Sequence, residues 1–188
     1  MTRLTKEERK AVIQNFYARV SEGIPIDDPW QKKMIEASAP VLPDNPSSEQ
    51  LDAWIELAEL VADPTFVESL RSSAKEVWSR SLDLRVMRAT NEAAAVAAAA
   101  ARGRGVAPSS GEAKKIVDDF VDGMAKASGK SSDAAMRRAI FERFEKHDPR
   151  ASRYWELVSI MKGAPSPVGK VEDWRFIAEA VRLHLRSA

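Results

Sequence analysis

Four carboxylates surround a tryptophan in the sequence between Ser47 and Pro64, and they are residue types that could bind a cation or move a proton. The acids are Asp52, Glu56, Glu59 and Asp63, and the indole belongs to Trp54. On a wheel turning about 100° per residue, the acids share an arc of about 60° and Trp54 lies nearly opposite. The spacing therefore predicts a solvated acidic face and a core tryptophan rather than a cation site.

Carboxylates four residues apart on a helix repel each other weakly, so this acidic face needs basic partners. The following stretch of the chain is rich in cations. We expect it to supply the compensating charges from Arg71, Lys75, Arg80, Arg85 and Arg88.

Other patterns that would indicate catalysis do not occur in the sequence. His147 and His184 are the only histidines, and there is no cysteine. No H-E-x-x-H or G-x-S-x-G motif is present. The stretch 163–170, "GAPSPVGK", lacks the glycine spacing and the Ser or Thr of a phosphate loop. We therefore predict no catalytic residue, no metal site and no cofactor, and we expect that the chain is not an enzyme.

Charge and hydropathy also limit the partners. Lys and Arg total 29 against 28 Asp and Glu, so the whole chain gives no electrostatic reason to bind nucleic acid or a membrane surface. The longest run of low polarity, 93–101, is far shorter than the roughly 20 residues of a membrane span. No signal peptide is recognisable at the N-terminus. We expect a soluble, cytoplasmic protein.

Helix start and stop signals punctuate the whole sequence, and they predict an all-α fold of about eight helices. Capping pairs occur at Thr5 with Glu8, at Ser47 with Gln50 and at Ser109 with Glu112. Asp-Pro pairs at 28–29, 63–64 and 148–149 are typical of helix starts. Ser132 or Asp133 is expected to begin another helix, and Gly163 to end one.

The helix that begins after Asp63 meets no stop signal before Gly103, so we expect it to approach forty residues, with a kink near Thr90 and Asn91. The segment 102–111, "RGRGVAPSSG", reads as a linker. The predicted organisation is an N-terminal helical half, 1–101, and a C-terminal helical half, 112–188, which the long helix and the linker join.

Alanines and aromatic residues are the remaining candidates for binding. The run 93–100, "AAAVAAAA", suits either a stable connector or a close helix contact, within one chain or between chains. Each tryptophan is more often a core residue than a pocket wall, but large aromatic side chains also line apolar ligand sites. We select five aromatic residues as candidate ligand contacts: Trp54, Trp78, Tyr154, Trp155 and Trp174.

The first half of the chain resembles a known family. "LTKEERKAVIQNFYARV", a short helix with a tryptophan, and "LPDNPSSEQLDAWIELAELVADPTFVESLR" are similar to the region behind the DNA-binding domain of actinobacterial MerR-type transcriptional regulators. The resemblance covers residues 5–85. It implies a C-terminal effector-sensing region that binds a drug-like or natural-product molecule. The winged-helix domain that precedes this region in the family has no counterpart here, so we expect contact with DNA only through a missing N-terminal domain.

These observations lead to one expected function and two alternatives. We expect a ligand-sensing module that binds a small hydrophobic molecule in an aromatic-lined cavity between helices. A stand-alone drug-sequestering protein or a helical protein-interaction module is the alternative, and a cofactor-free enzyme is a third. A homodimer is left open.

Overall fold

The computed structural model describes residues 5–26, 28–38, 42–78, 82–163 and 171–186. Within these ranges every regular element is an α-helix, nine in total, so the predicted all-α class is confirmed. For five residues in helices only the backbone is described, namely Asp28, Trp30, Ser38, Val77 and Trp78. The chain divides into two compact units, each with its own hydrophobic core.

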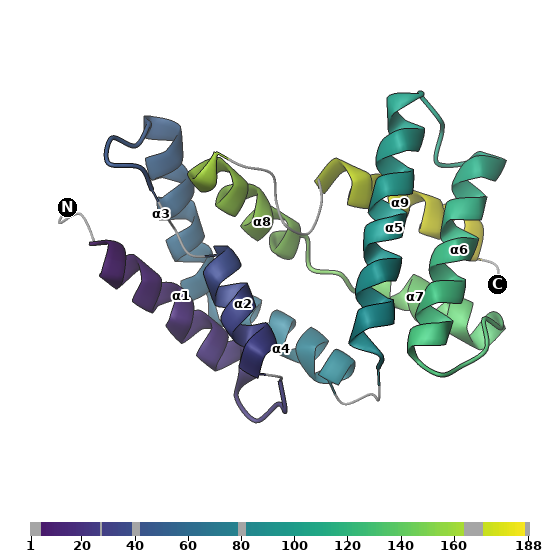
Figure 1. Ribbon diagram of the computed structural model, residues 1–188, viewed down its shortest axis with the longest axis horizontal. Coiled ribbons are helices and arrows are strands. Elements are labelled where there is room, and N and C mark those ends of the chain that lie inside the picture. The colour runs from purple at the N-terminus through teal and green to yellow at the C-terminus, as the bar shows by residue number, and fades with distance from the viewer. Residues whose placement is uncertain (1–4, 27, 39–41, 79–81, 164–170, 187–188) are drawn as a thin grey trace. The chain divides into compact units, whose positions relative to one another are not determined.

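Unit 1 comprises Met1–Ser79 and Asp148–Pro167. Its helices are α1 (Lys6–Ser21), α2 (Asp28–Ser38), α3 (Ser48–Ala62), α4 (Pro64–Trp78) and α8 (Pro149–Lys162). Helix α3 packs against α8, and α1 packs against α2, α3 and α4 (Figure 1). The core between them is aromatic, because Phe16 stacks on both Phe66 and Tyr154 at ring separations of 5.8 and 5.6 Å.

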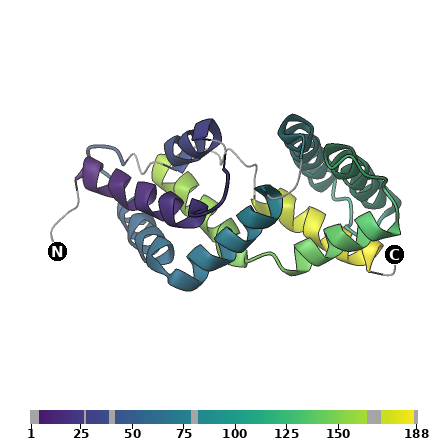
Figure 2. The same cartoon turned by 90° about the horizontal axis from the view of Figure 1, so that it is seen from below.

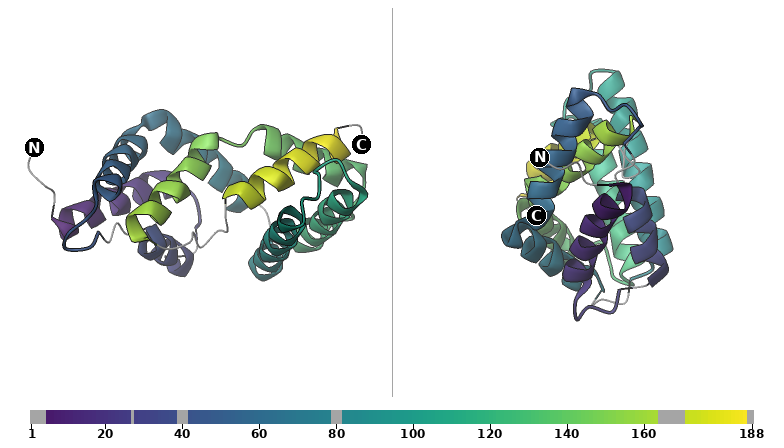
Figure 3. Two further views of the ribbon diagram at one scale, coloured as in Figure 1. Left: turned by 90° about the horizontal axis from the view of Figure 1, so that it is seen from above. Right: turned by 90° about the vertical axis from the view of Figure 1, so that its left-hand side faces the viewer.

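Unit 2 comprises Arg80–His147 and Val168–Ala188. Its helices are α5 (Leu84–Gly103), α6 (Gly111–Ala127), α7 (Ala134–Glu145) and α9 (Val171–Leu185). Helices α5 and α6 lie side by side (Figure 3), and α9 packs against both of them and against α7, along which it runs (Figure 2).

Several helix ends follow the sequence signals. Thr5 and Ser47 each form a complete capping box. The side chain of the capping residue accepts a hydrogen bond from the backbone N–H three residues later, and the side chain of that later residue accepts one from the N–H of the capping residue. Asp148 caps α8 with Pro149 at its first position, and Gly163 ends α8 with a positive φ of 61°, a conformation that glycine adopts without strain. These signals act within one turn of helix, so the local sequence is sufficient to predict them.

The expected helix of nearly forty residues is wrong. Two helices, α4 and α5, occupy that stretch, and α5 starts at Leu84 because Asp83 caps it. The Asp83 carboxylate accepts from the N–H groups of Arg85 and Val86 at 3.0 and 3.2 Å, and the Asp83 N–H donates to the Ala127 carbonyl of α6 at 2.8 Å. Helix α5 continues unbroken through Thr90 and Asn91, so no helix end falls there.

The segment 102–111 joins two helices of the same unit. Ser110, rather than the expected Ser109, caps α6 by accepting from the Ala113 N–H at 3.1 Å, while Glu112 pairs with Arg104. In place of consecutive halves 1–101 and 112–188, the chain passes between units near residues 79, 147 and 167. Helix α8 returns to unit 1 after unit 2 is mostly complete.

The alanine run is used for a close helix contact within the chain. Ala94, Ala98 and Ala101 on α5 are buried against α6 and α9. At the other end of this contact, Thr90 faces Gly123 so closely that a Cβ on Gly123 would lie 2.5 Å from the Thr90 Cγ2 atom and still closer to its Oγ1. Small residues thus set the separation of the two helices.

We expect Gly123→Ala to destabilise the protein by about 1–3 kcal/mol, because the added methyl group overpacks the contact with Thr90. This sign is opposite to the usual gain of about 0.5–1 kcal/mol when alanine replaces glycine inside a helix. Chemical denaturation would measure the change. The double variant Thr90→Ala with Gly123→Ala should recover part of the loss, and a stabilised single variant would contradict the close contact.

Candidate functional site

Three of the five aromatic candidates lie in unit 1. Trp54 on α3 is 8% exposed and Tyr154 on α8 is 3% exposed, both within the core. Trp155 is half-buried and meets Tyr154 edge-on at a ring separation of 5.3 Å. The prediction that Trp54 is a core residue is confirmed. Their role as ligand contacts stays a prediction, because these side chains pack against neighbouring residues of the core.

The other two candidates belong elsewhere. Trp174 is a half-buried residue of α9 in unit 2, where it meets Phe120 edge-on at a ring separation of 6.4 Å. Trp78 is the last residue of α4, and its side chain lies outside the described residues. The structure therefore brings Trp54, Tyr154 and Trp155 into one core, and places Trp174 in the other.

The acidic face of α3 is solvated as predicted, but its partners come from a different helix. Asp52, Glu56 and Glu59 are exposed. Arg153 of α8 holds Glu56 through two hydrogen bonds of 2.6 Å, which is the main cause of the lowered pKa of that carboxyl. Of the cations expected to compensate the face, Arg71 instead pairs with Glu22 at 3.4 Å. The i, i+4 pattern could identify the acids, but not the distant helix that pairs with them.

Arg150 at the start of α8 is the centre of a charged cluster in unit 1. Its guanidinium binds both oxygens of Asp148 at 2.7–3.1 Å, contacts Asp63 at 2.8 Å and lies 5.3 Å from the centre of the Phe66 ring. The hydrogen bonds from Arg150 hold the pKa of Asp148 at about 2, below the ordinary 3.8. All donors and acceptors here come from the protein itself, so the cluster joins α8 to the corner between α3 and α4.

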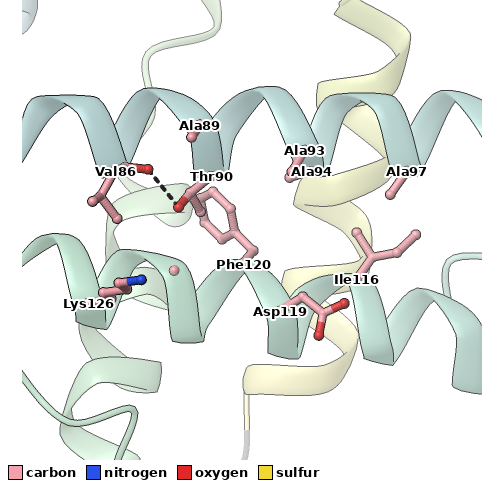
Figure 4. A pocket seen from close by; sticks show the side chains of 11 residues that line it. Val86, Ala89, Thr90, Ala93, Ala94, Ala97, Ile116, Asp119, Phe120 and Lys126 are labelled. Carbon is pink, nitrogen blue, oxygen red and sulfur yellow. Dashed lines mark hydrogen bonds between the residues drawn. The ribbon is translucent and has the colours of Figure 1, made fainter.

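A groove of about 440 Å³ runs between α5 and α6 in unit 2. This volume lies within the range of about 300–1,000 Å³ that is usual for small-molecule sites. Figure 4 shows the two helices side by side, with the Phe120 ring reaching from α6 toward Thr90 of α5. The full lining is Val86, Ala89, Thr90, Ala93, Ala94, Ala97, Ile116, Asp119, Phe120, Gly123 and Lys126.

The groove is apolar along its length and charged only at its edge. Asp119 and Lys126 lie two turns apart on α6, and Asp119 is engaged by Lys115, with Nζ 2.7 Å from Oδ2. The Thr90 hydroxyl is satisfied by the Val86 carbonyl at 2.9 Å. With one acid and one base along its rim, the groove is suited to bind an apolar molecule and offers no pair of convergent acids for proton transfer.

Sequence reasoning missed most of this lining. None of the four aromatic candidates whose side chains are described lines the groove, although Trp174 contacts its wall through Phe120. The available signal was the alanine run, which indicated a close helix contact. The groove itself arises because Ala89, Ala93 and Ala97 leave space opposite Ile116 and Phe120, and only the pairing of α5 with α6 shows this.

In the part of the chain described, no group of three or more His, Asp and Glu side chains could hold a metal ion. The described helices also include none that is long and apolar enough to cross a membrane. His184 sits in the last turn of α9, with Nε2 3.0 Å from the Pro108 carbonyl oxygen, so its ring helps to fix the loop between α5 and α6.

No protein-family model, curated protein or solved structure matches this chain.

The Asp148 carboxylate gives unit 1 a defined acid sensitivity. The pKa of this carboxyl is about 2 in the folded protein, and its ordinary value is 3.8. Its contribution to the free energy of unfolding is therefore complete above about pH 5 and is lost as the pH falls through 4 toward 2. The shift corresponds to about 2 kcal/mol. We expect Asp148→Asn to lower the free energy of unfolding at pH 7 by up to this amount, and to flatten its acid dependence, in denaturation curves between pH 3 and 7.

Asp52→Asn provides the matched control, because Asp52 is an exposed acid on α3. The free energy of unfolding of that variant should depend on pH between 3 and 7 as it does in the parent protein. An Asp148→Asn variant whose stability falls with acid as steeply as that of the parent would show that the cluster does not hold the carboxylate as described.

Proposed function

We propose that this chain is the effector-binding region of a MerR-type transcriptional regulator and that it binds a small hydrophobic molecule in the α5–α6 groove. The class of protein rests on the resemblance of residues 5–85 to the sensing regions of that family. The place of binding rests on the groove, which is the observation that carries the proposal: an apolar channel of about 440 Å³ along the alanine-rich helix. We assign the role to the cytoplasm, where such regulators act.

Ligand binding there would change the packing of unit 2. The groove lies over the contact that sets the separation of α5 and α6, and its floor includes Thr90 and Gly123. A ligand shifts a conformational equilibrium only by its difference in affinity between two states. A molecule wedged beside this contact would favour the state with the groove open, and this supplies a physical route from binding to a change in helix packing.

A panel of hydrophobic antibiotics and natural products would test the proposal by thermal unfolding. A ligand that binds only the folded protein stabilises it by RT ln(1 + [L]/Kd), about 2.7 kcal/mol at a concentration 100 times Kd. We expect a saturable rise in Tm with at least one compound. We expect quenching of Trp174 fluorescence as well, because the indole contacts the groove wall at Phe120.

Two variants of α5 locate the site. Ala93→Phe should fill the groove and abolish the Tm shift, since Ala93 is an exposed lining residue whose replacement leaves the core intact. Ala99→Phe is the matched control, because Ala99 is exposed on the same helix but is not a lining residue. Equal loss of the shift in both variants, or a shift that survives Ala93→Phe, would place the ligand elsewhere.

A helical protein-interaction module is the second candidate, and one observation favours it. Val96 on α5 is 65% exposed, and the neighbouring Ala93 and Ala100 are exposed as well. The exposed apolar strip is continuous with the groove through Ala93. A helix from another protein chain could cover such a strip, because small side chains allow two helix backbones to approach closely.

The interaction candidate predicts association that depends on this strip. If a second copy of the chain is the partner, sedimentation velocity should show a monomer–dimer equilibrium, and Val96→Arg should shift it fully to the monomer. Leu183→Arg is the control, because Leu183 is another exposed apolar residue of unit 2, 54% accessible, on α9. A monomer at all concentrations would contradict self-association.

A further inference from the structure

We infer that the ligand of the α5–α6 groove is an elongated amphipathic anion, an apolar chain that carries a carboxylate, with its charged end at Lys126. This inference rests on the proposed function and adds the chemical class of the ligand. It begins from the charges along the rim. Lys126 lies at the Val86 end of the groove (Figure 4), is exposed, and forms no ion pair with any described residue.

The other charged lining residue is already neutralised and lies away from that end. Asp119 pairs with Lys115, and seven residues of helix, about 10 Å, separate it from Lys126. An anionic group is attracted to Lys126, whereas the Asp119–Lys115 ion pair carries no net charge that would attract it. A ligand with one charge is therefore oriented, with its carboxylate toward Val86 and its apolar chain toward Ile116 and Ala97.

Two acids lie near the Lys126 end: exposed Asp122, one turn earlier on α6, and Asp83, the cap of α5, which is engaged. The Asp83 carboxylate accepts from the N–H groups of Arg85 and Val86 in the first turn of α5. Exposed Arg85 and Arg88 add positive charge to the same end of α5. The amino-terminal end of a helix also favours a nearby anion, so the local balance at this end of the groove is positive.

The charge of the unit as a whole acts in the same direction. Unit 2 contains 17 Lys and Arg residues and 12 Asp and Glu residues, whereas unit 1 contains 12 and 16. The near-neutral total of the chain therefore conceals a basic unit that holds the groove and an acidic unit that does not. A net positive unit raises the local concentration of anionic ligands and the rate at which they bind.

Three probes with the same ten-carbon tail and different head groups would test the inference: decanoate, decanol and decyltrimethylammonium, each below its micelle concentration. Isothermal titration with the full chain should give the tightest binding for decanoate. Lys126→Met should weaken decanoate binding about fivefold, the effect expected for an exposed charge pair, and should leave decanol binding unchanged. Raising the salt concentration should weaken decanoate binding to the parent protein and should leave decanoate binding to the Lys126→Met variant unchanged.

Lys146→Met is the control, because Lys146 is an exposed lysine of unit 2 that pairs with Glu142 and is not a lining residue. This variant should bind decanoate like the parent. Decanoate and decanol binding with equal affinity, both blocked by Ala93→Phe, would overturn the anionic class and leave the groove as a binding site for neutral molecules. Failure of all three probes would overturn the inference, while the Tm panel would still decide the proposed function separately.

Discussion

The close approach of α5 and α6 at Thr90 and Gly123 is the constraint on which the core of unit 2 and its groove both depend. A helix pair separated by larger residues would fill the space between its backbones with side chains. Here glycine and alanine bring the helices together at the floor, and Phe120 and Ile116 stand beside them as walls. The same small residues therefore produce a tightly packed contact below and an open channel above.

The two units use different kinds of interaction. Unit 1 depends on stacked aromatic rings around Phe16 and on α8, whose Arg150 and Arg153 reach the acids of α3. Unit 2 depends on small side chains and on caps such as Asp83. The net charge of unit 2 is positive, whereas that of unit 1 is negative. A total charge near zero thus says little about either unit, because the two excesses cancel in the sum.

Local signals predicted the class of fold and several helix ends, since a cap such as Ser47 or a terminator such as Gly163 acts within one turn. The break before Leu84 escaped prediction because Asp83 is held by a carbonyl of α6, more than forty residues later. The same limit applied to the candidate site. Periodicity could assign Trp54 to the core, but the groove needs the pairing of two helices, and no aromatic residue marks it in the sequence. Tyr154 is an example: a tyrosine is a residue type that often lines ligand pockets, but in the folded protein its neighbours bury it in the core of unit 1.

The return of α8 to unit 1 has a consequence for the order in which the chain can fold during synthesis. The first 79 residues leave the ribosome without Tyr154, Leu157 and Met161, which complete the core around Phe16. Those residues follow only after most of unit 2 has been made. The aromatic rings of α1 and α4 must therefore wait, partly uncovered, through the synthesis of nearly seventy intervening residues, Arg80–His147. Neither unit can be obtained intact by cutting the chain once, and no circular permutation makes either unit contiguous, because the segments of the two units alternate along the chain.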